Sequence, residues 1–370
     1  MKRILHILPQ FQPGGGMERV VMNYFNHIDS SKFCFDILTH KLENHIYADQ
    51  IENSGGKVFV FPSFGLKTIA EIAHRFDELL STRHYDVVHC HMANAAIVYL
   101  KIARKYDIPL RILHSHQDHY ADVWSHAIRN IPLVAIGRRY ANCNIACSKK
   151  AGEFLFKNVP FTILKNGIDV SDFSFSNVKR KNIREKLGIT DEELVFGYIG
   201  RLVPQKNPIF ILDVFFDCLK VSDRRMRLVI AGTGELELQM KNYAADLGID
   251  EKIIWLGNVE YVSELDSGID IFLMPSLYEG LGLSLVEAQS TGAECYASDS
   301  IPEEAFITDC VHPLPLCKGK KYWASQIMDN MNNSPKNRSL AWHEIVHNGF
   351  DISSNITNLE NIYTHKDRGL

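Results

Sequence analysis

The chain has 370 residues, and because a single hydrophobic core stops growing at about 250–300 residues, we expect two domains. Hydrophobic residues make up 46% of the chain and charged residues 23%, a composition that excludes a disordered or fibrous protein. The formal net charge of -4 lacks the basic excess that is typical of nucleic-acid-binding proteins. We therefore expect no nucleic-acid partner.

The cysteines and the apolar runs indicate the compartment. None of the eight cysteines forms a Cys-x-x-Cys pair, which argues against a zinc ribbon and a disulfide framework and predicts reduced thiols in a cytoplasmic protein. The first residues, MKRILHILPQ, lack a signal-peptide cleavage site. Charged residues or histidines interrupt each apolar run before it reaches the roughly 18 residues that a membrane span needs, so no span is expected.

In the first half of the chain, short apolar runs rich in β-branched residues alternate with amphipathic stretches, which is typical of a parallel sheet covered by helices. We expect seven strands there, at residues 3–8, 33–40, 57–62, 86–90, 110–115, 143–147 and 161–166. We expect helices at residues 18–28, 69–80, 94–106 and 149–156.

Residues 169–187 are polar and charged and begin without strand periodicity, so we interpret them as a linker. Strands then resume at residues 194–200, 227–232, 252–257, 271–275 and 294–298. The pattern predicts an α/β protein of two Rossmann-like, doubly wound domains facing across a cleft. The boundaries are 1–172 for the first domain, 173–348 for the second and 349–370 for a final helix that packs back on the first.

The turn after the first strand, PGGGMERVV, opens a helix. The glycines, Gly15 and Gly16 among them, let backbone N–H groups approach a phosphate at the helix N-terminus. The turn is not a Gly-x-Gly-x-x-Gly motif, and no acidic residue closes the second strand as a dinucleotide site requires. A tight turn without a ligand is the alternative.

A second candidate is the segment PSLYEGLGLSLVEA, which places Glu279 in a turn and Glu287 inside a helix. The backbone amides of Gly280, Leu281, Gly282, Leu283 and Ser284 form the start of that helix and suit a diphosphate or sugar hydroxyls. The plainer interpretation makes Glu279 a carboxylate that complements the helix dipole and Glu287 a solvated surface residue.

Arg201 and Lys206 follow another strand in the segment GRLVPQKNP. Arginine offers a planar fork to phosphate oxygens and lysine a mobile point charge, so the pair can neutralise a leaving diphosphate. Solvated loop cations are the alternative. Two cations at one strand end, with two carboxylates and free amides at another, predict a nucleotide-sugar pocket.

Histidines gather at two strand ends, as His89 with His91 and as His114 with His116. Residues two apart on a strand share a face, which also suits a metal pair, but no carboxylate or thiol spacing completes a zinc site. The chain contains no Asp-x-Asp pair to hold Mg²⁺ or Mn²⁺ against a diphosphate. We therefore expect no divalent metal and no other cofactor.

Several motifs together resemble a known family. In order they are PGGGMERVV, HSH, CSKKAGEFL, KNGID, GRLVPQKNP, LVIAGTGEL, IIWLGNV and EGLGLSLVEA with its Glu-x₇-Glu spacing. This ordered set, spread over nearly the whole chain, resembles the retaining glycosyltransferases of family 4, which have the GT-B fold. The tail GFDISSNITNLENIY and the segment HSHQD resemble the branch that makes bacterial exopolysaccharide and capsule.

The resemblance implies that the second domain binds a nucleotide-sugar donor and the first an acceptor. Arg201 and Lys206 would then bind the diphosphate, Glu287 the ribose hydroxyls and Glu279 the transferring sugar, and the backbone at Gly257 and Val259 would read the base.

For the other matched positions, the resemblance implies that the amides of residues 280–284 hold sugar and phosphate. Gly15 and Gly16 would close on the diphosphate, and His116 would lie beside the reacting centre. Asn166 lies in a turn that approaches the interdomain region.

The implied activity is transfer of a sugar from a nucleotide-diphosphate sugar, expected to be a UDP-sugar, to a hydroxyl of a glycan or lipid-linked saccharide, with retention of configuration. After Glu287 the chain departs from the family pattern and reads GAECYASDSIPEEAFITD, so donor identity is not carried over. The alternatives are a nucleotide-sugar epimerase, a Rossmann oxidoreductase that uses the glycines of AGTGEL, and a non-catalytic polysaccharide-assembly subunit.

The segment HAIRNIPLVAIGRRY, residues 126–140, combines an apolar stripe with Arg129, Arg138 and Arg139. It suits a peripheral contact with anionic lipid at the inner face of the cell membrane. An ordinary surface helix is the alternative.

Overall fold

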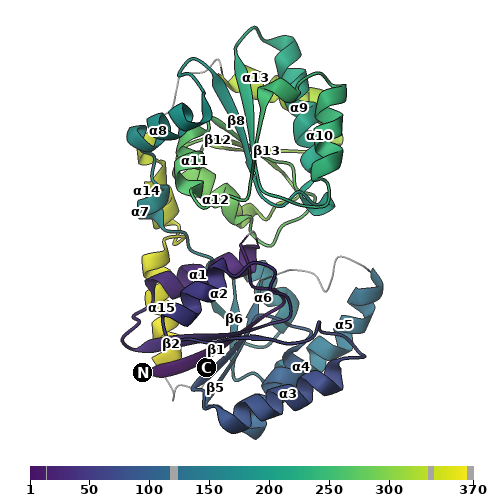
Figure 1. Cartoon of the computed structure of the whole chain (residues 1–370), viewed down its shortest axis with the longest axis vertical. Helices are drawn as coiled ribbons and strands as arrows, with labels where there is room; N and C mark the ends of the chain where they lie inside the picture. Colours follow the sequence, from purple (N-terminus) through teal and green to yellow (C-terminus); the bar gives the residue numbers. More distant parts are fainter. Residues whose placement is uncertain (14, 117–123, 332–336, 365–370) are drawn as a thin grey trace. The chain divides into compact units, whose positions relative to one another are not determined.

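The computed structural model describes residues 1–13, 15–116, 124–331 and 337–364, of which residues 124–129 are described by their backbone only. The chain divides into two compact units (Figure 1). The first comprises Met1–Gly167 and Ile352–Leu370, and the second comprises Ile168–Asp351. The chain passes from the first unit to the second after Gly167 and returns to the first after Asp351. Both positions lie within a few residues of the boundaries expected at 172 and 348.

The first unit is built on a parallel sheet with the strand order β3-β2-β1-β4-β5-β6-β7. Its strands are β1 (Lys2–Leu8), β2 (Phe33–Thr39), β3 (Val58–Val60), β4 (Val87–Cys90), β5 (Leu110–Ser115), β6 (Cys143–Ala146) and β7 (Thr162–Ile163). All seven strands expected in the first half are present. The order reverses between β1 and β4, which makes the carboxyl ends of these strands a favoured ligand position.

Helices cover the sheet of the first unit. They are α1 (Gly16–His27), α2 (Ile46–Asn53), α3 (Ile69–Thr82), α4 (Ala96–Lys105), α5 (Trp124–Gly137) and α6 (Lys149–Phe156), with the 3₁₀ turn η1 (Arg138–Tyr140). The four helices expected from the sequence are confirmed within two residues at each end. Helix α2 was missed because it is short and buries only Ala48 and Ile51.

Helix α15 (Ile352–Thr364) belongs to the first unit although it lies near the end of the chain (Figure 1). Two hydrogen bonds fix it. The Lys2 Nζ atom donates to the Tyr363 carbonyl at 2.6 Å, and the Asp29 backbone N–H donates to Glu360 Oε1 at 2.9 Å. The helix thereby places the fully buried Tyr363 side chain against β1 and β4, where it contacts His6 and His89.

The second unit has a parallel sheet of its own, with the order β10-β9-β8-β11-β12-β13. Its strands are β8 (Leu194–Ile199), β9 (Met226–Ala231), β10 (Ile253–Gly257), β11 (Ile271–Met274), β12 (Glu294–Ser298) and β13 (Val311–Leu314). The sequence predicted the first five of these strands and missed β13. That strand contains Pro313, which an edge strand tolerates because one side of it needs no hydrogen-bond partner.

The prediction of a linker at residues 169–187 is wrong. Those residues form α7 (Val170–Phe173) and α8 (Asn177–Leu187), and α8 packs against α11 (Val262–Gly268). Although α8 is polar in composition, one of its charged side chains is buried in an ion pair. Arg184 is 1% exposed, and its Nη2 atom lies 2.5 Å from Asp270 Oδ2. A charged helix can therefore belong to a core when its charges are paired inside it.

The remaining helices of the second unit complete its two layers around the sheet. They are α9 (Pro208–Val221), α10 (Glu237–Asp246), α12 (Leu283–Ser290), α13 (Gly319–Met331) and α14 (Ala341–His347). The 3₁₀ turns are η2 (Pro204–Lys206), η3 (Asp250–Lys252), η4 (Glu303–Ala305), η5 (Leu316–Lys318) and η6 (Arg338–Leu340). Across the described part of the chain, every helix is too short or too polar to cross a membrane.

Candidate active site

Lys206 and Glu279 form an ion pair at the carboxyl ends of β8 and β11. The Lys206 Nζ atom donates to Glu279 Oε1 at 2.6 Å, and the two side chains are 16% and 6% exposed. Lys206 ends the turn η2, and Asn207, which follows it, adopts a left-handed conformation with φ of 50° before Pro208 begins α9. Two candidates that lie 73 positions apart in the sequence are therefore in direct contact.

The backbone around this pair is also joined. The Leu277 N–H donates to the Gln205 carbonyl at 2.8 Å, and the Gln205 side-chain amide donates to the Tyr278 carbonyl at 3.1 Å. These bonds tie the loop after β8 to the loop after β11. Gln205 was not among the residues expected at the site, because a glutamine in a loop carries no chemical signature of its own.

Arg201 lies in the same loop but is exposed. Its carbonyl accepts a hydrogen bond from the Tyr198 hydroxyl at 2.8 Å, and its Nη2 atom lies 3.4 Å from Gln205 Oε1. The backbone of Arg201 is thus held while the guanidinium contacts a neutral amide and no carboxylate that the structure records. A guanidinium in this state keeps its donors for an anion.

Helix α12 begins directly after the turn that carries Glu279. Its N-cap, Gly282, has φ of +87°, a conformation that favours glycine, and an added Cβ would lie 3.1 Å from the Met274 methyl group. Gly280 and Ser284 are half-buried, whereas Leu281 and Leu283 are buried. Glu287 lies within α12 and is 1% exposed, so the interpretation of Glu287 as a solvated surface residue is wrong.

The glycines of AGTGEL bring the loops after β8 and β9 into close contact. Gly232 has φ of +134°, and an added Cβ would collide with the Gly200 carbonyl oxygen; at Gly234 it would collide with the Leu202 carbonyl oxygen. The Gly232 N–H donates to the Gly257 carbonyl at 2.7 Å, and Val259 follows, half-buried. These packing roles account for the glycines without a dinucleotide.

The opening turn of the first unit contains a contact that the sequence did not predict. Gly15 is the N-cap of α1, and an added Cβ there would collide with the carboxylate of Glu18, which is 2% exposed. At Gly16 an added Cβ would meet nothing within 4 Å. The first turn of α1 therefore holds a carboxylate of its own, in the position where helix N-termini stabilise negative charge.

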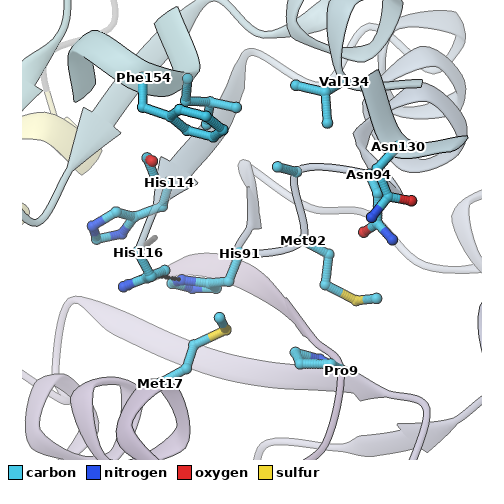
Figure 2. A pocket seen from close by; sticks show the side chains of 13 residues that line it. Pro9, Met17, His91, Met92, Asn94, His114, His116, Asn130, Val134 and Phe154 are labelled. Atoms are coloured by element: carbon cyan, nitrogen blue, oxygen red, sulfur yellow. Dashed lines mark hydrogen bonds between the residues drawn. The ribbon is translucent and has the colours of Figure 1, made fainter. Parts of the chain in front are cut away.

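His116 lies at one side of a pocket of about 240 Å³ in the first unit (Figure 2). His91, His114, Met17 and Phe154 also line this pocket. The His116 Nε2 atom lies 2.8 Å from His91 Nδ1, and burial lowers the pKa of His116 to about 3. The ring is therefore neutral near pH 7.

Asn166 is 7% exposed, and its Oδ1 atom accepts no hydrogen bond among the described residues. It precedes Gly167, the last residue of this part of the first unit, whose carbonyl accepts from the Asn23 side-chain amide at 3.0 Å. The structure thus places Asn166 next to the residue after which the chain passes from the first unit to the second.

Two groups of histidines have nitrogen atoms close enough to one another for a metal ion, namely His6 with His89 and His91, and His91 with His114 and His116. Nitrogen lone pairs lie in the plane of the imidazole ring. The rings of His89 and His91 are stacked, with centroids 4.3 Å apart and planes 19° apart, whereas those of His114 and His116 are tilted, with centroids 4.1 Å apart and planes 31° apart. Because stacked rings direct their lone pairs side by side, His89 and His91 do not point toward a common ion.

Comparison with known proteins decides the family. Residues 14–172 match the family model described as Glycosyltransferase Family 4, and residues 179–311 match the one described as Glycosyl transferases group 1. The glycosyltransferase EpsF of Bacillus subtilis strain 168 is 30% identical over 99% of this chain and 98% of its own length. This chain is a family 4 glycosyltransferase.

Two further comparisons concern the fold and the kind of donor that relatives use. The UDP-Gal:alpha-D-GlcNAc-diphosphoundecaprenol alpha-1,3-galactosyltransferase of Escherichia coli is 25% identical over 77% of the transferase and 76% of its own length. The crystal structure of Anabaena HepE in complex with UDP-glucose superimposes with a TM-score of 0.77 at 17% identity, covering 98% of the transferase and 99% of HepE. The transferase has the GT-B fold, as the sequence predicted.

The structure therefore brings Lys206 and Glu279 together and places Arg201 in the same loop of the transferase. Within the first unit it places Gly15 and His116 in different surroundings, the first beside Glu18 and the second in the histidine-lined pocket. The roles of all these residues toward a donor remain predictions.

Proposed function

We propose that this glycosyltransferase moves a sugar from a UDP-sugar to a hydroxyl of a lipid-linked saccharide or glycan during the synthesis of a bacterial surface polysaccharide. The observation that carries the proposal is the Lys206–Glu279 ion pair at the start of α12, with Arg201 in the loop that the pair anchors. The UDP donor and the lipid-linked acceptor named for the E. coli relative support the choice of substrates.

In this proposal the second unit stabilises the leaving diphosphate. Lys206 and Arg201 supply positive charge, and the backbone amides at the start of α12 add the positive end of the helix dipole. Glu279 holds Lys206 in place through the 2.6 Å contact and accepts a hydrogen bond from a hydroxyl of the transferring sugar. The buried carboxylate of Glu287 binds the ribose hydroxyls.

The proposed transfer retains the anomeric configuration and needs no divalent ion. The two cationic side chains and the helix N-terminus take the place of Mg²⁺ at the diphosphate, in a chain that lacks an Asp-x-Asp pair. The acceptor hydroxyl then attacks from the face that the diphosphate leaves. An epimerase would instead convert the nucleotide sugar in the absence of any acceptor.

A donor panel tests the proposal. A ligand that binds only the folded protein raises its stability by RT ln(1 + [L]/Kd), so the right donor raises the melting temperature. We expect a UDP-sugar to raise it, GDP- and ADP-sugars to raise it less, and the Lys206→Ala variant to lose the shift. A wild-type protein that responds to no nucleotide sugar contradicts the proposal, and conversion of the donor without acceptor supports the epimerase.

We also propose that α5 gives the transferase a peripheral contact with anionic lipid. Ile131 and Ile136 are 45% and 41% exposed on this helix, and Arg139 is exposed just beyond it. The side chains of His126 and Arg129 lie outside the described residues. Salt-sensitive sedimentation with vesicles that contain anionic lipid tests this contact, and sedimentation equal to that with neutral vesicles contradicts it.

A further inference from the structure

Arg201 and Lys206, the two cations of the loop after β8, differ in their partners. Lys206 is paired with Glu279 at 2.6 Å, and both of those side chains are largely buried. Arg201 is exposed and forms no ion pair with a carboxylate in the described part of the chain; its guanidinium contacts the side-chain amide of Gln205. The unbalanced positive charge of this loop therefore lies on Arg201, and Gln205 is the residue that meets it.

Hydrogen bonds fix the backbone on both sides of Arg201. The N–H groups of Gly200 and Leu202 donate to carbonyls in and just after β9, both at 2.9 Å. The Arg201 carbonyl accepts from the Tyr198 hydroxyl at 2.8 Å. The part that remains free to rotate is the long side chain, and holding such a side chain in one direction costs conformational entropy. A contact that orients the guanidinium before a ligand arrives reduces the cost of binding.

Gln205 is held through both its backbone and its side chain. It is the middle residue of the turn η2 and is half-buried. Its carbonyl accepts from the Leu277 N–H at 2.8 Å, and its side-chain Nε2 atom donates to the Tyr278 carbonyl at 3.1 Å. Both partners belong to the loop after β11, in which Glu279 is the next residue. The loop that carries the Glu279 carboxylate thus also fixes Gln205.

The two ends of the Gln205 amide face partners of opposite kinds. A backbone carbonyl only accepts hydrogen bonds, and a guanidinium only donates them. The Nε2 atom therefore has to lie toward the Tyr278 carbonyl and the Oε1 atom toward Arg201, where Nη2 donates to it at 3.4 Å. Rotation of the amide by half a turn would lose both contacts. In a single orientation, the amide connects the Arg201 guanidinium to the loop of Glu279.

A glutamine suits this position because its side chain is neutral. A glutamate of the same shape would accept from the Arg201 guanidinium more strongly, but it would balance the charge and compete with phosphate oxygens for the same donors. Its carboxylate would also face the Tyr278 carbonyl oxygen with no proton to donate. The amide alone satisfies both neighbours and leaves the guanidinium charge unbalanced.

We propose that Gln205 is a positioning residue, which holds the Arg201 guanidinium toward the diphosphate of the donor and leaves its charge available to that anion. This inference rests on the proposed function, because it takes the diphosphate of a UDP-sugar as the anion that Arg201 meets. The two cations of the site are then held by different means. A carboxylate holds Lys206, and a neutral amide holds Arg201.

The test compares two ligands that differ only in the diphosphate. Uridine has the base and the ribose of UDP, so the ratio of the two dissociation constants, measured by calorimetry, reports what the diphosphate contributes to binding. We expect the wild type to bind UDP more tightly than uridine. Neither measurement requires an acceptor, and uridine binding also reports whether a variant keeps its nucleoside site folded.

The first variant, Gln205→Met, keeps the length of the side chain and removes both polar ends of the amide. The backbone carbonyl that accepts from Leu277 is unchanged, so we expect the fold to persist and uridine to bind as it does to the wild type. Affinity for UDP should fall roughly three- to tenfold, the effect of one hydrogen bond. The matched control is Gln326→Met, at a half-buried glutamine on α13, and it should change neither affinity.

The second variant, Gln205→Glu, separates charge from shape. The new carboxylate would pair with Arg201 and take its charge from the diphosphate, so we expect UDP affinity to fall roughly tenfold to a hundredfold, more than in Gln205→Met, at unchanged uridine affinity. If Gln205 only filled space, glutamate would be the milder substitution because it has the same shape. UDP affinity in Gln205→Glu that equals or exceeds that in Gln205→Met would therefore overturn the proposal.

A double-mutant cycle shows whether Gln205 acts through Arg201. The Arg201→Ala variant removes the guanidinium, and in that background Gln205→Met should cause no further loss of UDP affinity. Losses that add in the double variant would overturn the proposal, because they would show that Gln205 contributes independently of Arg201. Loss of uridine affinity in Gln205→Met would also overturn it, because it would show that the residue maintains the fold of the site.

The same measurements distinguish this inference from the proposed function. A wild-type protein that binds UDP no more tightly than uridine would contradict the diphosphate site itself, and with it both the proposed function and the role of Gln205. A wild-type preference for UDP that Gln205→Met leaves unchanged would overturn the role of Gln205 alone. A preference that falls in Gln205→Met, falls further in Gln205→Glu and is insensitive to Gln205 once Arg201 is removed is the result that we expect.

Discussion

The Lys206 ammonium lies 2.6 Å from the Glu279 carboxylate, and both side chains are largely buried. Each has the other as its counter-charge, at the point where the loops after β8 and β11 are joined by hydrogen bonds through Gln205. A buried ion pair contributes little net stability, whereas removing one partner alone is costly. A variant of Lys206 therefore has to be designed so that lost catalysis is separated from lost stability.

The first prediction uses two variants. Lys206→Ala lowers turnover by about 10²–10³, as removal of one stabilising donor does, and lowers folding stability by up to about 3–5 kcal/mol because it leaves a buried carboxylate alone. The double variant Lys206→Ala with Glu279→Gln recovers much of the stability and none of the turnover. Urea denaturation and UDP release measure the two effects.

The control for this prediction is Lys220→Ala. Lys220 lies on α9 with its side chain 57% exposed, 3.9 Å from Asp217, so its removal leaves turnover unchanged. Turnover of the Lys206 variant equal to that of the Lys220 variant would rule out a role for Lys206 at the diphosphate.

The second prediction concerns Glu287. The Glu287→Gln variant keeps the shape of the side chain but removes its charge, and a hydrogen bond to a charged group contributes about 1.5–3 kcal/mol. We therefore expect donor affinity, measured by calorimetry with UDP-sugar and with UDP, to fall roughly ten- to a hundredfold. The same change at the start of α10, Glu237→Gln, where the carboxylate is half-buried and paired with Lys241, leaves affinity unchanged. Equal affinities for the wild type and Glu287→Gln contradict the assignment to the ribose.

The third prediction separates backbone conformation from close contact. Gly232 and Gly248 both have positive φ, but an added Cβ collides with the Gly200 carbonyl only at Gly232 and meets nothing within 4 Å at Gly248. Gly248→Ala should cost about 1–2 kcal/mol, the penalty for a left-handed alanine. Gly232→Ala should cost clearly more, as measured by urea denaturation. Equal losses would show that the loops after β8 and β9 do not require the glycine for their contact.

The fourth prediction is that acid destabilises the first unit. Burial lowers the pKa of His6 and His116 to about 3 in the folded protein, whereas an unfolded histidine titrates near 6.5. Between these values the unfolded chain binds more protons than the folded one, so stability falls as pH falls from about 6.5 toward 3.

Denaturation midpoints at several pH values measure this dependence. His6→Gln removes one of the groups that gain protons on unfolding and should flatten the slope, and the exposed His84→Gln serves as the control. A slope that His6→Gln leaves unchanged would show that His6 does not contribute to the acid sensitivity.

The fifth prediction is that a chelator leaves turnover unchanged. In the proposed reaction, Arg201, Lys206 and the start of α12 would supply the charge that a divalent ion would otherwise provide. The measurement is UDP release before and after treatment with EDTA. Loss of activity that Mg²⁺ restores would contradict a metal-independent reaction.

Much of the fold could be predicted from local patterns. Strands such as β1, β8 and β9 are apolar runs closed by turn residues, and their alternation with amphipathic helices identifies two parallel sheets. The predictions for α8 and β13 failed because contacts with residues distant in the sequence, and not the local sequence pattern, determine the structure there. Helix α8 looked like a linker because its burial depends on the pairing of Arg184 with Asp270, and β13 was missed because Pro313 is tolerated only at the edge of a sheet.

For the candidate site, too, the sequence identified the reactive residue types but not the contacts between them. The motifs identified Lys206, Glu279 and Arg201, whose residue types carry chemistry, but the contact between Lys206 and Glu279 joins two loops 73 positions apart and has no local signal. His6 was missed altogether, because only the register of β1 with β4 places it beside His89. A histidine in an apolar strand gives no sign of which strand will be its neighbour.

The stereochemistry of the product tests the central claim most directly. The experiment combines the purified transferase with a UDP-sugar selected by the donor panel and a lipid-linked saccharide acceptor. The coupling constant of the anomeric proton in the new linkage is then measured by NMR. Retaining transfer from an α-linked UDP-sugar predicts an α-linked product, formed by the wild type and lost in Lys206→Ala. A β-linked product, or an α-linked product formed equally well by the variant, would contradict it.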